Sequence, residues 1–349
     1  MTPRRLRLGV LGPEPDAATL HSQQVTYQDA QFLALREHAD VVFGEATLAR
    51  LHDLDAVIAF DEQELLMQAG PSLPESLPCL LAFVTHDHWC HPLAVAELLG
   101  RYDRVLTVVR HAANQRLYRM LMPDVPCVLQ RPGVDATLYR PAEQPKAYDI
   151  LLSGRETDDY PVRVRLNAIV RDQAARRGWT VLDLPRQVGA VETDYAATLA
   201  SAKLSPTGTP REGVPAQMVL QYVDSSVGRL DLERDAPGLS GHPFYSYDRP
   251  AVAVRDVPVG GPPPRYLESM ACGTLLVGNL TAGDEWYRDK MVVVSLQDDD
   301  ETIGDVIDHW VRHDDEREAL CAYALAETLR TETTAIRAAE LAAILAEHV

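Results

Sequence analysis

The chain has 349 residues, of which 46% are hydrophobic and 24% are charged, and its formal net charge is −18 at pH 7. These proportions are typical of a globular protein large enough for two domains. The negative charge repels a phosphate backbone, which argues against nucleic acid as the main partner, and no apolar run approaches the length of a membrane-spanning helix.

The first third of the sequence alternates short apolar runs with segments of helical spacing. The expected helices include 27–38 and 92–101. Near-continuous apolar strands separated by helices indicate a parallel sheet that is covered on both faces. The expected strands are Leu6–Leu11, Asp40–Phe43, Ala56–Phe60, Cys79–Val84 and Arg104–Val109.

A polar segment, AFVTHDHWCHP at 82–92, follows the fourth of these strands. Ligands of open α/β sheets bind beyond the carboxyl ends of the strands, so His86 or Asp87 is placed beside a substrate. A histidine or carboxylate there is suited to accept a proton from a hydroxyl group. Two other interpretations stay open, namely histidines in a polar loop and a zinc site. The possible zinc ligands are His86, His88, Cys90 and His91, but no second ligand cluster accompanies them.

The alternation of apolar strands and helical segments is interrupted by a turn-rich connector, QRPGVDATLYRP at 130–141. It continues with the strand YDILLS at 148–153. We therefore expect two α/β units, an N-terminal domain over 1–143 and a C-terminal domain over 144–349. Gly154 ends the new strand and permits close approach of a ligand to the backbone. Positive charge gathers near this strand end at Arg155, Arg163 and Arg165.

Residues 206–264 are rich in proline, glycine and aspartate and contain only brief strand-like pieces, at 218–223 and 251–254. A structureless segment of this length is uncommon inside a compact domain. We interpret it as an insert with a functional role or as a small hairpin subdomain.

The stretch PPPRYLESMACGTLLVGN at 262–279 predicts a short helix from Pro264 to Ala271, followed by a buried strand. Proline suits the first turn of a helix, and Gly273 is expected to end it in the left-handed conformation. Arg265 and Glu268 then share one face. An arginine there suits a phosphate and a glutamate suits the vicinal hydroxyls of a ribose, although an internal Arg–Glu pair on a solvated face is the alternative from spacing alone.

Three of these stretches together resemble GT-B glycosyltransferases, especially the branch similar to spore-maturation-type enzymes. They are RYLESMACGTLLVGN, RPGVDATLYRP and YDILLSGRETDDYPVRVRL. The resemblance implies an α/β fold of two Rossmann-like domains that face each other across a cleft, with the last helix able to cross back to the N-terminal domain. It also implies that the segment with His86 and Asp87 faces the acceptor and the donor sugar.

By the same resemblance, Glu268 binds the ribose of a nucleoside-diphosphate sugar. The implied diphosphate neighbours are Gly154, Arg155, Arg163 and Arg265, and Gly273 is a further donor-binding residue. The implied activity is transfer of a sugar to an acceptor hydroxyl, with no metal and no bound cofactor. The sequence departs from the pattern of many retaining enzymes at Gly260, which stands eight residues before Glu268 where they carry an acidic residue.

Two alternatives remain at this point: a GT-B-like epimerase or phosphorylase, and a nucleotide-sugar-binding protein without catalysis. A dinucleotide-dependent dehydrogenase is disfavoured because GVLGPEPDA lacks the G-x-G-x-x-G turn after the first strand. The cysteines are scattered and odd in number, which favours reduced thiols and a cytoplasmic protein. The five cysteines are Cys79, Cys90, Cys127, Cys272 and Cys321.

Overall fold

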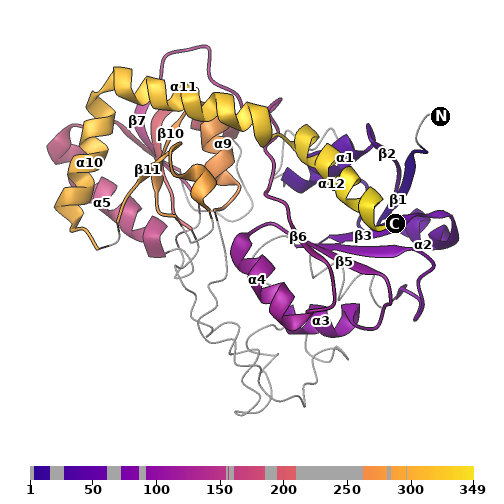
Figure 1. Cartoon of the computed structure of the whole chain (residues 1–349). Coiled ribbons are helices and arrows are strands. Elements are labelled where there is room, and N and C mark those ends of the chain that lie inside the picture. Colours follow the sequence, from indigo (N-terminus) through magenta and orange to yellow (C-terminus); the bar gives the residue numbers. More distant parts are fainter. Residues whose placement is uncertain are drawn as a thin grey trace, which may run out of the picture.

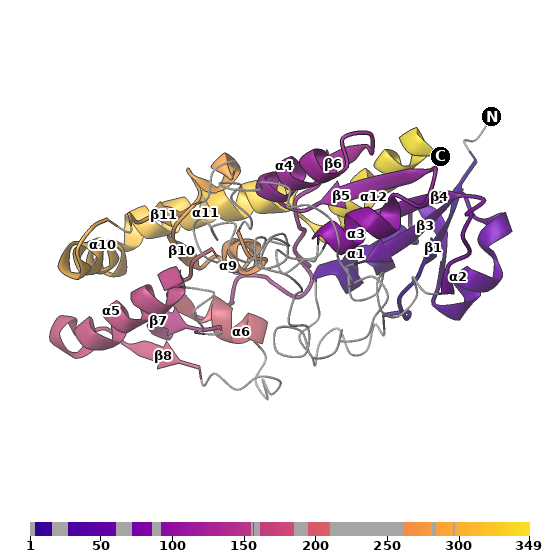
Figure 2. The same cartoon turned by 90° about the horizontal axis from the view of Figure 1, so that it is seen from below.

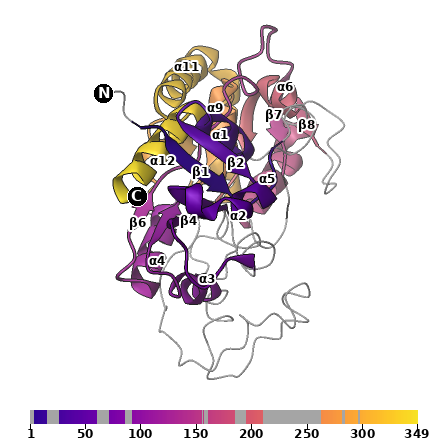
Figure 3. The same cartoon turned by 90° about the vertical axis from the view of Figure 1, so that its right-hand side faces the viewer.

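The computed structural model shows two parallel β-sheets, each flanked by helices (Figure 1). The structure describes residues 4–15, 27–60, 72–85, 92–154, 156, 161–184, 195–209, 262–280, 284–295 and 297–349. Figure 2 shows the two sheets side by side, with the C-terminal helices running along both, and in Figure 3 the N-terminal sheet lies in front of the other. The fold is α/β, as the alternation of apolar runs and amphipathic segments predicts.

The first sheet has six strands in the order β2-β1-β3-β4-β5-β6, and all neighbouring strands are parallel. The strands are β1 (Leu6–Val10), β2 (Ala39–Phe43), β3 (Ala56–Phe60), β4 (Leu80–Val84), β5 (Val105–Val109) and β6 (Cys127–Leu129). The helices are α1 (Tyr27–Leu35), α2 (Glu45–Ala49), the 3-10 helix η2 (Leu51–Asp53), α3 (Pro92–Leu99) and α4 (Ala112–Leu121). Five strands match the predicted runs, whereas the short β6 was not predicted.

The second sheet has five parallel strands in the order β11-β10-β9-β7-β8. The strands are β7 (Tyr148–Leu152), β8 (Val181–Asp183), β9 (Ala202–Pro206), β10 (Leu275–Gly278) and β11 (Val292–Val293). The helices up to β11 are α5 (Pro161–Arg177), α6 (Tyr195–Ala200), α9 (Arg265–Ala271) and the 3-10 helix η7 (Glu285–Tyr287). The predicted strand pieces at 218–223 and 251–254 lie outside the described residues.

Each sheet buries apolar side chains on both faces. On the first sheet, Leu81 and Phe83 pack toward α3 and α4, whereas their neighbours Leu80 and Ala82 pack toward α1. On the second sheet, α5 and α10 (Asp300–Arg312) cover one face, while α6, α9 and α11 (Asp314–Thr331) cover the other. Burying each Leu, Ile, Val or Phe contributes about 1.5–3 kcal/mol, so these cores hold the strand ends in fixed positions.

The last helix, α12 (Thr334–His348), belongs to the first core although it follows α11 in sequence. Ala338, Leu341 and Leu345 are fully buried and pack in the same cluster as Leu8 and Ile58 of the first sheet. Figure 1 shows the continuous yellow path from α11 beside the second sheet to α12 beside the first. The chain therefore passes between the two sheets twice, once after β6 and once between α11 and α12.

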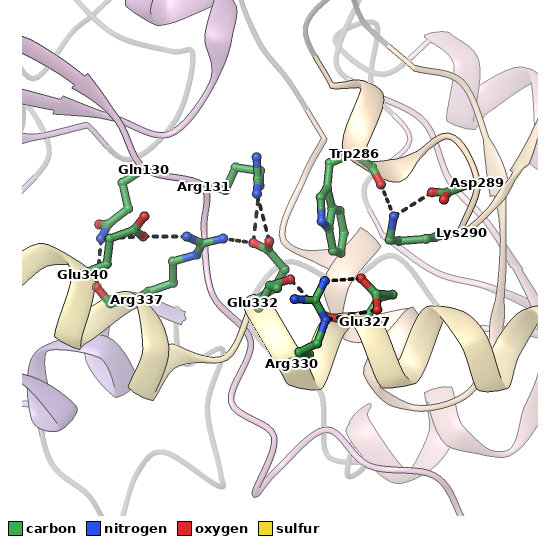
Figure 4. Close-up of polar contacts among 11 residues, drawn as sticks. Gln130, Arg131, Trp286, Asp289, Lys290, Glu327, Arg330, Glu332, Arg337 and Glu340 are labelled. Carbon is green, nitrogen blue, oxygen red and sulfur yellow. Dashed lines mark hydrogen bonds and ion pairs between the residues drawn. The ribbon is translucent and has the colours of Figure 1, made fainter.

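These two passages lie side by side, and we call residues 130–134 and 331–334 the interdomain crossing. Val134 and Thr333 form an isolated parallel bridge, in which the Val134 amide donates to the Glu332 carbonyl at 2.8 Å. The Glu332 carboxylate is fully buried and accepts from Arg131 at 3.0 Å and from Arg337 (Figure 4). The crossing is thus joined by both backbone hydrogen bonds and ion pairs.

Candidate functional site

Helix α9 presents Arg265 and Glu268 on one face. Five of its seven residues are buried, and only these two retain partial exposure. The prolines before it fit the helix start, where the Tyr266 and Glu268 amides donate to the carbonyls of Pro263 and Pro264 at 2.9 and 3.0 Å. Gly273 follows with the left-handed φ of 61° that the sequence predicts.

The buried face of α9 is fixed to the carboxyl ends of neighbouring strands. The Tyr266 hydroxyl donates to the Asn279 carbonyl at 2.7 Å, just beyond β10. The Asn279 side chain in turn exchanges hydrogen bonds with Thr209, which follows β9, at 2.7 and 2.9 Å. Helix α9 is therefore held at the carboxyl edge of the second sheet, where open α/β folds bind their ligands.

Arg265 lies directly against the end of β7. A Cβ atom placed on Gly154, whose φ is 93°, would lie 1.9 Å from Nη1 of Arg265. The same guanidinium stands 5.4 Å from the ring centroid of Tyr195 in α6, within the range of a cation–π contact. Glycine at 154 thus makes room for Arg265 beside the backbone.

Arg163 approaches the same glycine from α5. Its side chain is almost fully buried, its Nε donates to Thr207 Oγ1 at 3.2 Å, and its Nη1 lies 3.0 Å from the Cβ position of Gly154. Arg165, two residues on, instead pairs with Asp300 of α10 at 2.8 Å. The structure therefore brings Gly154, Arg163 and Arg265 together and directs Arg165 elsewhere.

Glu268 is an acid in an environment that favours its neutral form. Burial raises the pKa of this carboxyl, and Arg265 and the Tyr139 hydroxyl oppose that rise. Tyr139 comes from the connector after the first sheet, and its ring packs edge-on against Tyr195 with centroids 6.5 Å apart. Sequence reasoning named the connector as a motif but missed Tyr139 and Tyr195, because nothing local in the sequence indicates that they meet Glu268.

Several candidate residues lie outside the described residues. These are His86, Asp87 and Arg155, together with His88, Cys90, His91 and Gly260. Their assigned roles remain predictions. Within the part of the chain that the structure describes, no three His, Cys, Asp or Glu side chains gather in a way that could hold a metal ion. Among the same residues, no helix is both long enough and apolar enough to cross a membrane.

The arrangement matches solved structures over nearly the whole chain. HepE from Anabaena, in complex with UDP and glucose, has a TM-score of 0.58 at 11% identity, covering 98% of this chain and 100% of that one. Sucrose-phosphate synthase from Thermosynechococcus elongatus has a TM-score of 0.57 at 11% identity, covering 98% and 99%. AviGT4, a glycosyltransferase involved in avilamycin A biosynthesis, has a TM-score of 0.54 at 13% identity, covering 98% of both chains.

These likenesses establish the fold as GT-B, with two Rossmann-like domains. Residues 245–343, which include α9, match the family described as "Glycosyl transferase-like". No curated protein gives a significant sequence match. The segment that is similar to this family includes Arg265 and Glu268.

Proposed function

We propose that this protein is a glycosyltransferase that moves a sugar from a nucleoside-diphosphate sugar to an acceptor hydroxyl. The observation that carries the proposal is the placement of Arg265 and Glu268 on one face of α9, with Arg265 beside Gly154, where Arg163 also approaches. The GT-B fold and the family match over residues 245–343 support it. A donor of this kind contains a diphosphate, which arginine side chains can bind, and a ribose diol, which a glutamate can bind.

On the donor side, Arg265 and Arg163 would bind the diphosphate beside the Gly154 backbone, and Arg155 joins them on sequence grounds. Glu268 would accept hydrogen bonds from the two ribose hydroxyls, while Gly273 ends the helix that carries it. As the bond between the sugar and the diphosphate breaks, its electron pair moves to the departing phosphate oxygen. Arginine donors already in place stabilise the charge that gathers there.

On the acceptor side, we propose that His86 or Asp87 accepts the proton of the attacking hydroxyl group. The acceptor oxygen forms a bond to the anomeric carbon as the diphosphate leaves, and its proton passes to one of these side chains. Full transfer rates in both His86→Ala and Asp87→Ala variants would refute the assignment.

UDP is the first nucleotide to test, because the similar HepE structure contains UDP and glucose. A ligand that binds only the folded protein raises its melting temperature by mass action. We expect one of UDP, GDP, ADP or CDP to do so, and turnover of the matching donor to depend on an acceptor. If none of the four binds, the proposed function is wrong, whereas binding without any turnover would indicate a protein that lacks catalysis.

We also propose that transfer needs neither a metal ion nor a bound cofactor, so that chelators leave the rate unchanged. A rate that falls with EDTA and returns with a divalent cation would contradict this. We propose that the protein is located in the cytoplasm, because the cysteines that the structure describes are free thiols. Cys79, Cys127 and Cys272 are buried free thiols, and Cys321 is a partly exposed one, as a reducing compartment allows.

A further inference from the structure

Arg265 of α9 contacts both a strand end and an aromatic ring. Its Nη1 stands 1.9 Å from the Cβ position of Gly154, just beyond β7. Its guanidinium carbon lies over the ring of Tyr195, the first residue of α6, at 5.4 Å from the ring centroid. Arg265 also keeps partial exposure to solvent. The ring therefore contacts a guanidinium that a ligand can still reach.

Tyr195 is fixed to the same strand end as Arg265. Its hydroxyl lies 3.4 Å from Oγ of Ser153, the residue before Gly154. Its ring packs edge-on against that of Tyr139, with centroids 6.5 Å apart. The Tyr195 side chain is thus held at its hydroxyl and at its ring.

Helix α6, which carries this ring, is joined to the end of α9. The hydroxyl of Thr274, which follows α9, donates to the Leu199 carbonyl at 2.7 Å. Lys146 Nζ donates to the carbonyls of Ala200 at 2.8 Å and Cys272 at 3.3 Å, which lie at the ends of α6 and α9 respectively. These bonds fix one helix against the other, so they also fix the ring relative to the guanidinium.

We propose that Tyr195 is a positioning residue of the donor site, whose ring holds the Arg265 guanidinium beside Gly154, where it binds the diphosphate. This inference rests on the proposed function, since it concerns the same donor. An arginine side chain loses rotamer freedom when a ligand orders it, and that loss weakens binding. An aromatic ring orients a guanidinium in advance without neutralising its charge, as a carboxylate would.

A double-mutant cycle of Tyr195→Leu and Arg265→Met tests this role, with the affinity for UDP measured by calorimetry. Leucine has no π face, and methionine keeps much of the length of arginine without its charge. Tyr195→Leu should lower the affinity about tenfold when Arg265 is present. In the Arg265→Met background it should change the affinity by less than about twofold, because no guanidinium is left to orient. If a nucleotide other than UDP binds, the cycle uses that nucleotide.

A second series keeps the shape of the ring and decides the question even if Tyr195→Leu does not fold. Tyr195→Phe retains the π face and should retain most of the affinity that Tyr195→Leu loses. Fluorine in place of the ring hydrogens of this phenylalanine withdraws electron density from the face and weakens its attraction for a cation. The affinity for UDP should therefore fall stepwise with the number of fluorines.

Tyr323→Leu is the matched control. The Tyr323 ring lies 5.7 Å from Nζ of Lys290, and its hydroxyl donates to Asp289 at 2.8 Å. The same substitution there removes a cation–π contact and a tyrosine hydroxyl away from Arg265. It should leave the affinity for UDP unchanged in both backgrounds.

Equal losses for Tyr195→Leu in the two backgrounds, or affinities that do not follow the number of fluorines, would overturn the positioning role while leaving the proposed function intact. If Arg265→Met binds the nucleotide as tightly as the wild-type protein does, the diphosphate assignment of Arg265 fails and so does this inference. If the wild-type protein binds none of UDP, GDP, ADP and CDP, the proposed function and the inference both fail.

Discussion

Glu332 at the interdomain crossing is fully buried and Glu268 on α9 is partly buried, and their partners differ. The Glu332 side chain has no exposed surface and accepts from two guanidinium groups, those of Arg131 and Arg337 (Figure 4). Glu268 has one arginine near it and one tyrosine hydroxyl, and burial still raises its pKa. One carboxylate has its charge compensated within the protein, whereas the other is compensated only in part.

Under the proposed function, this difference separates a carboxylate that stabilises the fold from a carboxylate that binds a ligand. Removing one partner of a buried ion pair is strongly destabilising, because the other charge is left buried without compensation. A carboxylate whose ionisation is opposed by its surroundings instead destabilises the folded protein until a ligand donates hydrogen bonds to it. We therefore expect substitutions at Glu332 to change stability and substitutions at Glu268 to change affinity.

The largest effect is expected for Glu332→Ala. Arg131 and the almost fully buried Arg337 both lose the Glu332 carboxylate at the point where the chain passes between the domains, although Arg337 keeps its second partner, Glu340. The free energy of unfolding should fall by about 3–5 kcal/mol, as measured by urea denaturation. Glu340→Ala is the control, because Glu340 pairs with the same Arg337 but its side chain is 41% exposed. Its loss should cost less than about 1 kcal/mol, and equal losses in the two variants would contradict the comparison.

The second effect concerns binding. In Glu268→Ala the affinity for UDP, or for the nucleotide that binds in its place, should fall about a hundredfold, close to the value of two hydrogen bonds to a carboxylate. The melting temperature without nucleotide should not fall. Glu285→Ala is the control, since Glu285 pairs with Arg288 in an exposed i,i+3 arrangement. A variant that unfolds more readily but binds with wild-type affinity would reverse the roles of the two carboxylates.

The strands that sequence patterns predicted best are the near-continuous apolar ones, such as β4 (LLAFV) and β5 (VLTVV). The pattern failed at β9 (AKLSP), which lies in the middle of the second sheet yet contains Lys203 and Pro206. Lys203 is accommodated because its Nζ reaches Asp149 of β7 at 3.1 Å. This ion pair is a tertiary contact, so the local hydrophobic pattern of the sequence cannot predict it.

For the candidate site too, the sequence predicted the local features but not the contacts between distant segments. The spacing of Arg265 and Glu268 and the position of Gly154 at a strand end are local features, and the structure brings them together. Tyr139 and Tyr195 come from the connector and from α6, and only the fold brings them to Glu268. Composition and spacing alone do not separate Arg163 from Arg165, whereas the family resemblance assigned only Arg163 to the diphosphate. In the structure the two arginines face a strand end and an acidic helix respectively.

A third prediction uses two glycines with positive φ. Gly154→Ala places a Cβ 1.9 Å from Nη1 of Arg265, which must then move. Affinity for the nucleotide should fall about tenfold, because a charge-assisted contact to the diphosphate is displaced. Gly178→Ala, at a φ of 73° with no atom within 4 Å of the new Cβ, carries a similar backbone cost of about 1–3 kcal/mol without that contact. Equal affinities in the two variants would show that Arg265 does not need its place beside Gly154.

The smallest effect is a pH dependence of stability at Glu268. Because burial raises the pKa of this carboxyl above its unfolded value, the folded protein holds the proton more tightly, and stability is lost as the pH rises through the folded pKa. Glu268→Gln removes this loss of stability, because the glutamine side chain does not ionise. Without nucleotide, its melting temperature should exceed that of the wild-type protein at pH 8 by no more than about 2 °C, and the difference should shrink toward pH 5.

Addition of UDP should reverse the order of the two melting temperatures, since the ionised carboxylate is the better acceptor for the ribose. Glu285→Gln provides a control of opposite sign. The hydrogen bond from Arg288 lowers the pKa of Glu285, so its interaction is present at pH 8 and is lost as the pH falls. A Glu268→Gln variant that melts below the wild-type protein at pH 8 without nucleotide would mean that Arg265 and Tyr139 already compensate this carboxylate fully, as Arg131 and Arg337 compensate Glu332.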